Sequence, residues 1–264
     1  MYAFNYLKAS SLADAAKALS GDAKLLAGGQ TLLPTMKQRL ENAGTLIDLS
    51  GVAELKGIRR DGNTLRIGAM TTHADVARSA DVRSSIPALA KLAGGIGDPQ
   101  VRNAGTIGGS LANNDPADYP AGVLGLGATI LTNKREIAAD AYFTGLFSTA
   151  LQQGEIIVAV SFPVPAKAGY AKFEQRASRF CLASVFVAKT ASGVGAVRAA
   201  VSGAGASGVF RSTEIERALS GSFAADALRD VRVPASGLLS DLHGSAEYRA
   251  ALVGVMAARA VASA

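Results

Sequence analysis

A pair of glycines, Gly28-Gly29, stands where an apolar run near the start of the chain gives way to a helix-like pattern. The run "AKLLAGG" (23–29) predicts a buried strand, and "TLLPTMKQRL" (31–40) has the apolar spacing of a helix. Glycines at this junction can make a tight turn, with Thr31 as the cap of the helix. Their bare amides can instead receive a phosphate, because the backbone allows close approach and the helix dipole adds positive charge. The stretch by itself leaves both interpretations open.

The order of the expected elements divides the chain into three units. Residues 1–55 alternate short helices and strands, which predicts a small α/β unit. Residues 56–165 open with two strand-like runs around Asp61-Gly62-Asn63, a hairpin signal. The prolines of "FPVPAKAGY" (162–170) indicate a boundary, and 166–264 ends in an Ala-rich helix. Helices are expected at 10–19, 31–40, 72–80, 85–96, 211–221 and 244–264, and strands at 23–29, 45–50, 57–70, 155–163, 171–190 and 194–205.

Composition excludes several classes of site. Cys181 is the only cysteine, so the chain has no internal disulfide and cannot hold a thiolate-bound iron–sulfur cluster by itself. His73 and His243 lie far apart without ligand spacing, so no metal site is expected. The net charge of +6 is scattered, which argues against nucleic acid and favours an anionic ligand or an acidic partner. No export signal and no apolar run of membrane-spanning length is found, so a cytoplasmic protein without a membrane span is expected.

Three glycine clusters are candidates for binding phosphate. The run from Gly203 to Gly208 matches GxGxxG, but only 56 residues follow it, with no clear strand that ends in a ribose-binding acid. We interpret it as a close-packed strand-to-helix turn, and keep a Rossmann-type NAD-binding protein as the alternative. Gly28-Gly29 and Gly108-Gly109 lie in different units, and each is followed by a hydroxyl residue, Thr31 and Ser110. Two such loops can hold the two halves of one pyrophosphate in the cleft between the units.

The two loops and the segments after them resemble a known family. "AGGQTLLPTM" (27–36) and "VRNAGTIGGSLANNDPADYP" (101–120) resemble the FAD-binding medium subunit of the molybdenum hydroxylases, such as xanthine dehydrogenase and carbon monoxide dehydrogenase. "GEIIVAVSFP", "YAKFEQRASRF" and "VSGAGASGVFRSTEIERALSG" follow in family order. The resemblance implies an α+β protein with a two-subdomain FAD-binding fold of the vanillyl-alcohol oxidase/p-cresol methylhydroxylase (PCMH) type. Subdomains 1–55 and 56–165 would bind FAD, and 166–264 would form a C-terminal domain with a small antiparallel sheet and helices.

The resemblance also implies cofactor contacts at particular positions. The first loop would wrap the diphosphate, the second would take its other side, and Ile96 and Ile157 would make apolar contacts. Asp118 would reach sugar or ribityl hydroxyls, or else be an ordinary Asp in a proline-bounded turn. Lys172 would place a cation near the flavin, or be a solvated strand lysine, and Phe180 would cover the isoalloxazine ring, or be a core residue. The expected FAD contacts are Ala27, Gly28, Gly29, Gln30, Thr31, Leu32, Ile96, Thr106, Ile107, Gly108, Gly109, Ser110, Asp118, Ile157, Lys172 and Phe180.

Two of these positions depart from the family pattern, and several other polar residues are expected to have no part in the site. Gln30 stands where a histidine or another polar residue is frequent, and Ser110 replaces a frequent asparagine but remains a hydrogen-bonding residue. His73 and Cys181 are interpreted as structural. No catalytic residue is expected, because Asp140, Glu155 and Glu174 show no paired arrangement for acid–base work.

The function implied by the resemblance is electron transfer. The FAD would be bound non-covalently, since neither glycine loop contains His, Cys or Tyr. It would pass electrons from [2Fe-2S] clusters on a small partner subunit to NAD⁺, a quinone or oxygen, while a large partner subunit would carry the molybdenum cofactor. A dimer of heterotrimers is expected. A self-contained FAD-dependent reductase or oxidase and a non-enzymatic binding module are the alternatives.

Overall fold

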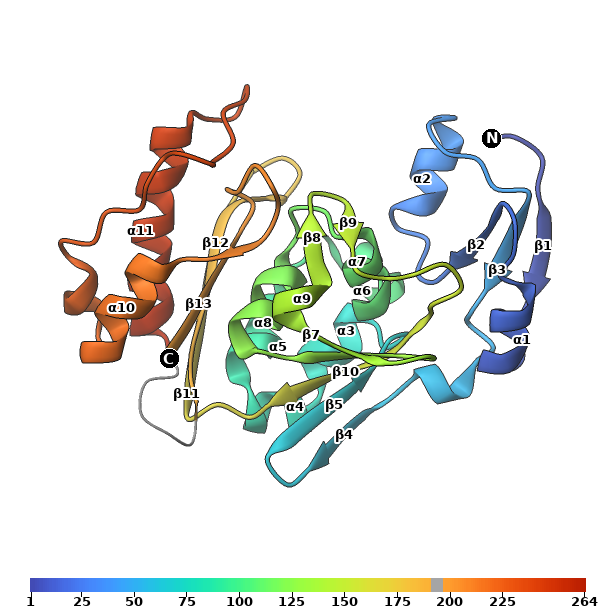
Figure 1. Cartoon of the computed structure of the whole chain (residues 1–264), viewed down its shortest axis with the longest axis horizontal. Helices are drawn as coiled ribbons and strands as arrows, with labels where there is room; N and C mark the ends of the chain where they lie inside the picture. Colours follow the sequence, from blue (N-terminus) through green and yellow to red (C-terminus); the bar gives the residue numbers. More distant parts are fainter. Residues whose placement is uncertain (191–196) are drawn as a thin grey trace.

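The computed structural model describes residues 1–190 and 197–264, and its sheets follow one another as a row of three units (Figure 1). A three-stranded sheet of order β1-β3-β2 comes first, a five-stranded sheet of order β4-β5-β10-β6-β7 second, and a four-stranded sheet of order β11-β12-β13-β14 last. A two-stranded sheet, β8-β9, accompanies the second unit. The expected α+β class is confirmed, and the expected domain limits stay predictions.

The first unit is a parallel sheet with helical crossovers. Both β1 and β2 pair parallel with β3, and parallel strands need a crossover connection, which α1 and α2 provide. Ser11 caps α1 by accepting a hydrogen bond from the Asp14 amide. Strand β2 ends at Leu26, so the glycines of the predicted strand form a loop instead. The elements are β1 (Asn5–Lys8), α1 (Leu12–Ala18), β2 (Ala23–Leu26), α2 (Leu32–Lys37) and β3 (Thr45–Asp48).

The second unit packs short helices on an antiparallel sheet (Figure 1). Its core joins Leu65, Ile67 and Phe162 of the sheet to the helices, and α8 is buried along its whole length. The predicted hairpin is confirmed, with Gly62 at φ +56° in the turn. The elements are η1 (Ala53–Leu55), β4 (Ile58–Asp61), β5 (Thr64–Gly68), α3 (His73–Arg78), α4 (Ala80–Ser85), α5 (Pro87–Gly94), α6 (Pro99–Ala104), α7 (Ile107–Asn113), α8 (Asp118–Leu126), β6 (Thr129–Thr132), β7 (Glu136–Ala138), α9 (Ala139–Tyr142), β8 (Phe143–Gly145), β9 (Ser148–Thr149) and β10 (Ile157–Pro163).

The third unit packs the terminal helix α11 on an antiparallel sheet. Arg249 of α11 is buried and donates to the carbonyls of Leu182 and Gly203 at 2.8 and 2.9 Å and to the Asp241 carboxylate at 2.8 Å. Gly169 of β11 lies against the Ala260 carbonyl of the same helix. The elements are β11 (Lys167–Glu174), β12 (Cys181–Lys189), β13 (Val197–Ser202), β14 (Phe210–Arg211), α10 (Thr213–Gly221), η2 (Ala225–Leu228) and α11 (Ala246–Ala262).

The GxGxxG run connects two antiparallel strands, β13 and β14, so its interpretation as a strand-to-helix turn is wrong. Gly203 and Gly208 have φ of +83° and +101°, a backbone region that favours glycine. A Cβ on Gly205 would lie 2.3 Å from the Gly208 carbonyl oxygen. The glycines therefore serve a tight connection, and the run opens no helix as a Rossmann phosphate site must. Residues 194–196 of the strand expected at 194–205 lie outside the described residues.

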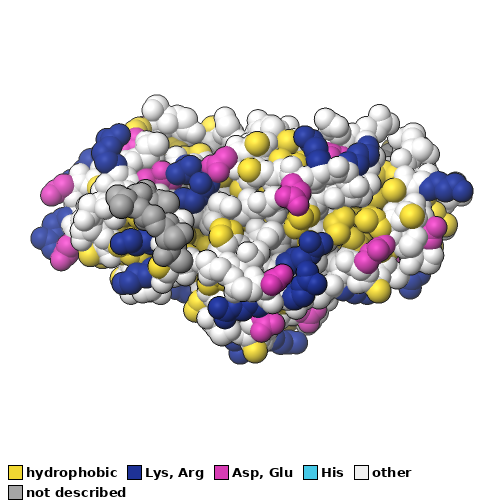
Figure 2. Space-filling model, turned by 60° about the horizontal axis from the view of Figure 1, so that its bottom comes forward, with side chains coloured by type: hydrophobic (Ala, Val, Ile, Leu, Met, Phe, Trp, Pro, Cys, Tyr) yellow, Lys and Arg dark blue, Asp and Glu magenta, His cyan; other side chains and the backbone are white. Residues whose placement is uncertain are grey.

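Charge is mixed on one face of the molecule. On the face shown in Figure 2, basic and acidic side chains are interspersed, without a stripe of one sign. No helix in the described ranges is long and apolar enough to cross a membrane.

Gly169→Ala tests the packing of α11 on the sheet. A Cβ at this position would lie 1.8 Å from the Ala260 carbonyl oxygen, so the helix must shift. We expect the free energy of unfolding to fall by about 2 kcal/mol or more in urea titrations. Gly254→Ala is the control, since a Cβ there meets nothing within 4 Å and alanine favours the helix. Equal stabilities for the two variants would contradict the close packing.

Candidate functional site

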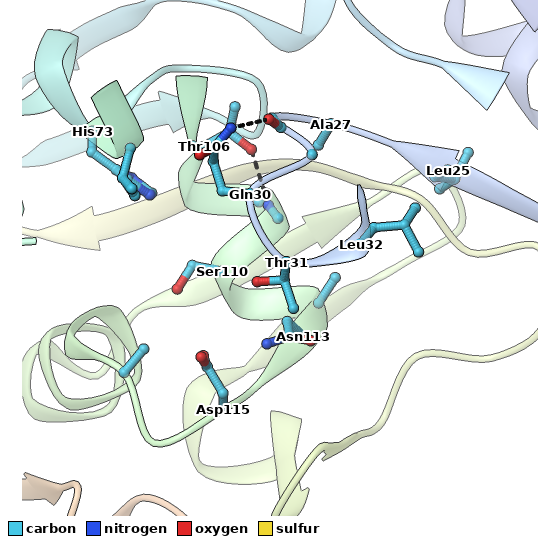
Figure 3. Close-up of a pocket in the computed structure, with 18 of the residues that line it drawn as sticks. Leu25, Ala27, Gln30, Thr31, Leu32, His73, Thr106, Ser110, Asn113 and Asp115 are labelled. Atoms are coloured by element: carbon cyan, nitrogen blue, oxygen red, sulfur yellow. Dashed lines mark hydrogen bonds between the residues drawn. The ribbon is translucent and has the colours of Figure 1, made fainter. Parts of the chain in front are cut away.

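A cavity of about 780 Å³ lies between the first and second units, and the loop between β11 and β12 of the third unit completes its lining. Figure 3 shows Thr31 of the first glycine loop and Ser110 and Asp115 of the second unit around the same space. The expected contacts that line the cavity are Ala27, Gly28, Gly29, Gln30, Thr31, Leu32, Ile96, Thr106, Gly108, Gly109, Ser110, Asp118, Ile157 and Phe180. Ile107 and Lys172 do not line it.

The first loop lines the cavity and leaves its backbone amides without protein acceptors in the described part of the chain. Among the hydrogen bonds of the described residues, none is donated by an amide from Gly28 to Thr31. Gly29 has φ +67°, which turns the chain, and the Gln30 side chain donates to the Gly28 carbonyl at 3.0 Å. Thr31 makes no side-chain cap on α2, so the interpretation of this residue as a helix cap is wrong. The loop fits an anion, since amides without protein acceptors need another partner.

The second loop uses most of its amides within the fold. Ile107 donates to the Thr71 carbonyl at 3.2 Å and Gly108 to the Ala69 carbonyl at 2.8 Å. Thr106 caps α7 by accepting from the Gly109 amide at 3.1 Å. The Ile107 side chain is buried in the core of the second unit. This loop therefore lines the cavity mainly with its side chains and its bonded backbone, and it offers few free amides.

The glycines also let the two loops touch. A Cβ on Gly28 would lie 2.1 Å from the Ala104 carbonyl oxygen and 2.7 Å from the Gly105 Cα. A Cβ on Gly108 would lie 2.6 Å from the Ala69 Cβ. Gly109 is different, because a Cβ added there would have Thr106 Oγ1 at 3.1 Å and the Ala27 Cβ at 3.5 Å as its nearest atoms. Gly28 and Gly108 are thus required for packing, whereas Gly109 keeps cavity space open.

Asp118 is held by two residues of the third unit. It is 5% exposed, it accepts a hydrogen bond from the Tyr170 hydroxyl, and the Lys172 Nζ lies 3.1 Å from its Oδ1. Burial raises the pKa of Asp118, and the Lys172 ammonium and the Tyr170 hydrogen bond oppose that shift. The side chain of Lys172 is 7% exposed, so its interpretation as a solvated lysine is wrong. A direct contact between Lys172 and the flavin stays a prediction.

The β11–β12 loop brings Ala177 to Phe180 to the cavity. Phe180 is 57% exposed, which rules out the alternative of a core phenylalanine. Arg179 has φ +59° and approaches the Gly97 carbonyl at 3.5 Å. An exposed aromatic ring beside a ligand cavity can stack on a planar ligand.

Several lining residues were not expected from the sequence. Lys24 pairs with Glu41 at 3.1 Å, and Glu155 pairs with Arg135 at 2.8 Å, which lowers the pKa of Glu155 to about 2. Lys24, Asn113 and Asp115 could have been predicted, because they stand close to the two glycine loops in the sequence. The unexpected polar lining residues include Lys24, Glu41, His73, Asn113, Asp115 and Glu155.

His73 is a buried part of this wall. It is 5% exposed, its ring lies 5.3 Å from that of Tyr119, and its Nδ1 has no hydrogen-bond partner within the described part of the chain. Burial, with a smaller effect of the Arg102 charge, lowers the pKa of His73 to about 4. The imidazole is therefore neutral at physiological pH. Within the described ranges, no group of three or more His, Cys, Asp or Glu is arranged to hold a metal ion.

Comparison with known proteins decides the family. The model described as "FAD binding domain in molybdopterin dehydrogenase" matches residues 2–165. The chain belongs to this family. It is an FAD-binding subunit of a molybdenum-dependent oxidoreductase, and the free amides and the volume of the cavity fit a dinucleotide.

Similarity to curated relatives and solved structures covers nearly the whole chain. The chain is 35% identical to the carbon monoxide dehydrogenase medium chain of Hydrogenophaga pseudoflava, over 92% of this chain and 89% of the relative. It is 37% identical to the nicotine 6-hydroxylase medium subunit of Paenarthrobacter nicotinovorans, over 99% and 97%. Reconstituted carbon monoxide dehydrogenase from Oligotropha carboxidovorans superposes with a TM-score of 0.89 at 33% identity, over 100% and 98%. Quinoline 2-oxidoreductase from Pseudomonas putida 86 gives 0.87 at 30%, over 99% and 96%. The expected family and fold are confirmed.

His73 predicts a particular acid sensitivity. The unfolded chain takes up this proton near pH 6.5, the ordinary value, whereas the folded chain takes it up only near pH 4. The stability due to neutral His73 is therefore complete above pH 6.5 and falls by up to about 3 kcal/mol as the pH falls to 4. His73→Gln cannot take up the proton, so the difference in unfolding free energy between wild type and variant should change over this range. Parallel pH profiles in urea titrations would contradict the assignment.

Gly109→Val tests whether the cavity is the FAD site. The side chain would occupy cavity space, while its Cβ contacts of 3.1 and 3.5 Å need only a small adjustment. We expect the Kd for FAD to rise at least about a hundredfold by calorimetric titration, with the circular dichroism spectrum retained. Gly254→Val makes the same change in α11, in open space, and should leave the Kd unchanged. Full FAD affinity in folded Gly109→Val would place the cofactor elsewhere.

Proposed function

We propose that this chain carries electrons from the iron–sulfur clusters of a small partner subunit, through its FAD, to an external acceptor. The observation that carries the proposal is the cavity between the first two units, with the amides from Gly28 to Thr31 free of protein acceptors in the described structure. Bound FAD supplies the redox chemistry that these side chains lack.

Different residues of the cavity would contact different parts of FAD. The Gly28–Thr31 amides and the hydroxyls of Thr31 and Ser110 would hold the diphosphate, since free donors stabilise an anion. Asp118 would accept a hydrogen bond from a sugar or ribityl hydroxyl. Phe180, exposed at the β11–β12 loop, would cover the flavin ring and shield it from water.

The relatives support a multi-subunit assembly. They are named as medium chains or medium subunits of dehydrogenases and hydroxylases, which implies a large and a small partner. We assign the molybdenum cofactor to the large partner and the [2Fe-2S] clusters to the small one, in keeping with the single cysteine of this chain. A dimer of heterotrimers, a cytoplasmic location and the choice of acceptor among NAD⁺, a quinone and oxygen stay predictions.

The purified chain should contain one non-covalent FAD, which acid precipitation releases into the supernatant. Flavin that remains in the pellet, or FMN in place of FAD, would contradict this mode of binding.

The route of electrons is tested by mixing this chain with the small subunit. Dithionite-reduced small subunit should bleach the flavin absorbance of this chain in stopped-flow mixing, and Gly109→Val without FAD should give no such signal. Failure of the reduced small subunit to bleach the flavin, together with sustained oxidation of NADH by the isolated chain, would favour a self-contained reductase instead.

A further inference from the structure

We propose that Tyr170 and Lys172 of strand β11 are positioning residues that fix the Asp118 carboxylate in the cavity wall as an acceptor for an FAD hydroxyl. This inference rests on the proposed FAD site and assigns to the third unit a part in forming it. It differs from a direct role of the Lys172 cation at the flavin ring.

Strand geometry brings the two residues to one carboxylate. Side chains two positions apart on a strand point to the same face, so Tyr170 and Lys172 both face Asp118 at the start of α8. The Tyr170 hydroxyl donates to Oδ1, and the Lys172 Nζ lies 3.1 Å from Oδ1 and 3.2 Å from Oδ2. Asp118 lines the cavity, whereas neither Tyr170 nor Lys172 does. Both residues can therefore act on a ligand only through Asp118 or through the wall.

Because Asp118, Tyr170 and Lys172 are buried, their contacts fix the orientation of the Asp118 carboxylate. Asp118 is 5% and Tyr170 3% exposed, and the Lys172 side chain is 7% exposed. A buried carboxylate without its donors is costly, so the side chain is confined to the rotamer that meets both. Glu174, 3.9 Å from the Lys172 Nζ, is half exposed and competes weakly. The ammonium is thus committed to Asp118 and is not available as a free cation for the flavin.

Lys172 also fixes a second part of the wall. Its Nζ donates to the Gly95 carbonyl at 3.0 Å, at the C-terminal end of α5, where a cation is favoured by the helix dipole. Ile96 and Gly97, the next two residues, line the cavity. One lysine of the third unit therefore holds two cavity-lining segments of the second unit.

A double-mutant cycle tests the inference. The Kd for FAD is measured by fluorescence titration of the full chain after removal of FAD. Tyr170→Phe keeps the ring and removes only the hydroxyl, and should raise the Kd about tenfold, as should Lys172→Met and Asp118→Asn. In the Asp118→Asn background, adding Tyr170→Phe should alter the Kd by no more than about twofold, because the carboxylate that the hydroxyl positions is gone. Lys172→Met also releases the Gly95 carbonyl, so in this background it should still raise the Kd, but by less than its tenfold effect in the wild-type chain.

The midpoint potential of the bound flavin separates positioning from direct contact. In the Asp118→Asn background, Lys172→Met should leave the potential unchanged. A lower potential would show that Lys172 acts on the flavin itself and would overturn the inference. Effects of Tyr170→Phe and Asp118→Asn on the Kd that simply add would overturn it too, because the hydroxyl would then not act through the carboxylate. Lost thermal stability with an unchanged Kd in Tyr170→Phe would make the contact merely structural and would overturn it as well.

Lys167→Met is the matched control for charge. Lys167 is exposed at the start of the same strand and does not line the cavity, so its loss should leave the Kd unchanged. Failure of the wild-type chain to bind FAD would instead refute the proposed function, which keeps the two failures apart.

Discussion

The close approach of the two glycine loops is the contact on which the site depends. Gly28 lies so near the Ala104 carbonyl and the Gly105 Cα that no side chain fits between them. The loops belong to different units, so this backbone contact both joins the units and closes the wall of the cavity. The contact between the loops is made by Cα and carbonyl atoms and does not use the amides. The amides from Gly28 to Thr31 have no acceptors among the described residues. The same glycines therefore serve packing and would also serve the proposed binding of an anion.

As the proposed FAD site, the cavity would have to accept an anionic diphosphate although five acidic residues line it. Most of these acids are already satisfied: Glu41 by Lys24, Asp118 by Lys172, and Glu155 by Arg135. Asp98 accepts the Val101 amide at 2.8 Å as the cap of α6. Asp115 forms no ion pair within the described ranges, and burial raises its pKa. The net field met by a phosphate is therefore weaker than the number of carboxylates suggests.

The third unit is part of the site and not an appendage. It supplies the exposed Phe180 and, through Lys172, the contact that holds both Asp118 and the end of α5. Its own integrity rests on Arg249 and on the packing of Gly169 against α11. A change in that unit can therefore affect the cavity from a distance, because the buried ion pair between Lys172 and Asp118 crosses between the second and third units.

The sequence by itself determined the paired glycine motifs, the hairpin at Asp61–Asn63 and the family, because turn chemistry and close backbone approach restrict residue type locally. It could not predict β1, whose four residues are all exposed and show no alternation, or α8, which is buried on every side and so lacks an amphipathic pattern. Only the tertiary structure decided that the Thr31 side chain makes no capping hydrogen bond, that Ile107 faces the core, and that Lys172 meets Asp118. These outcomes depend on which surfaces meet across units, and residue spacing along the chain does not contain that information.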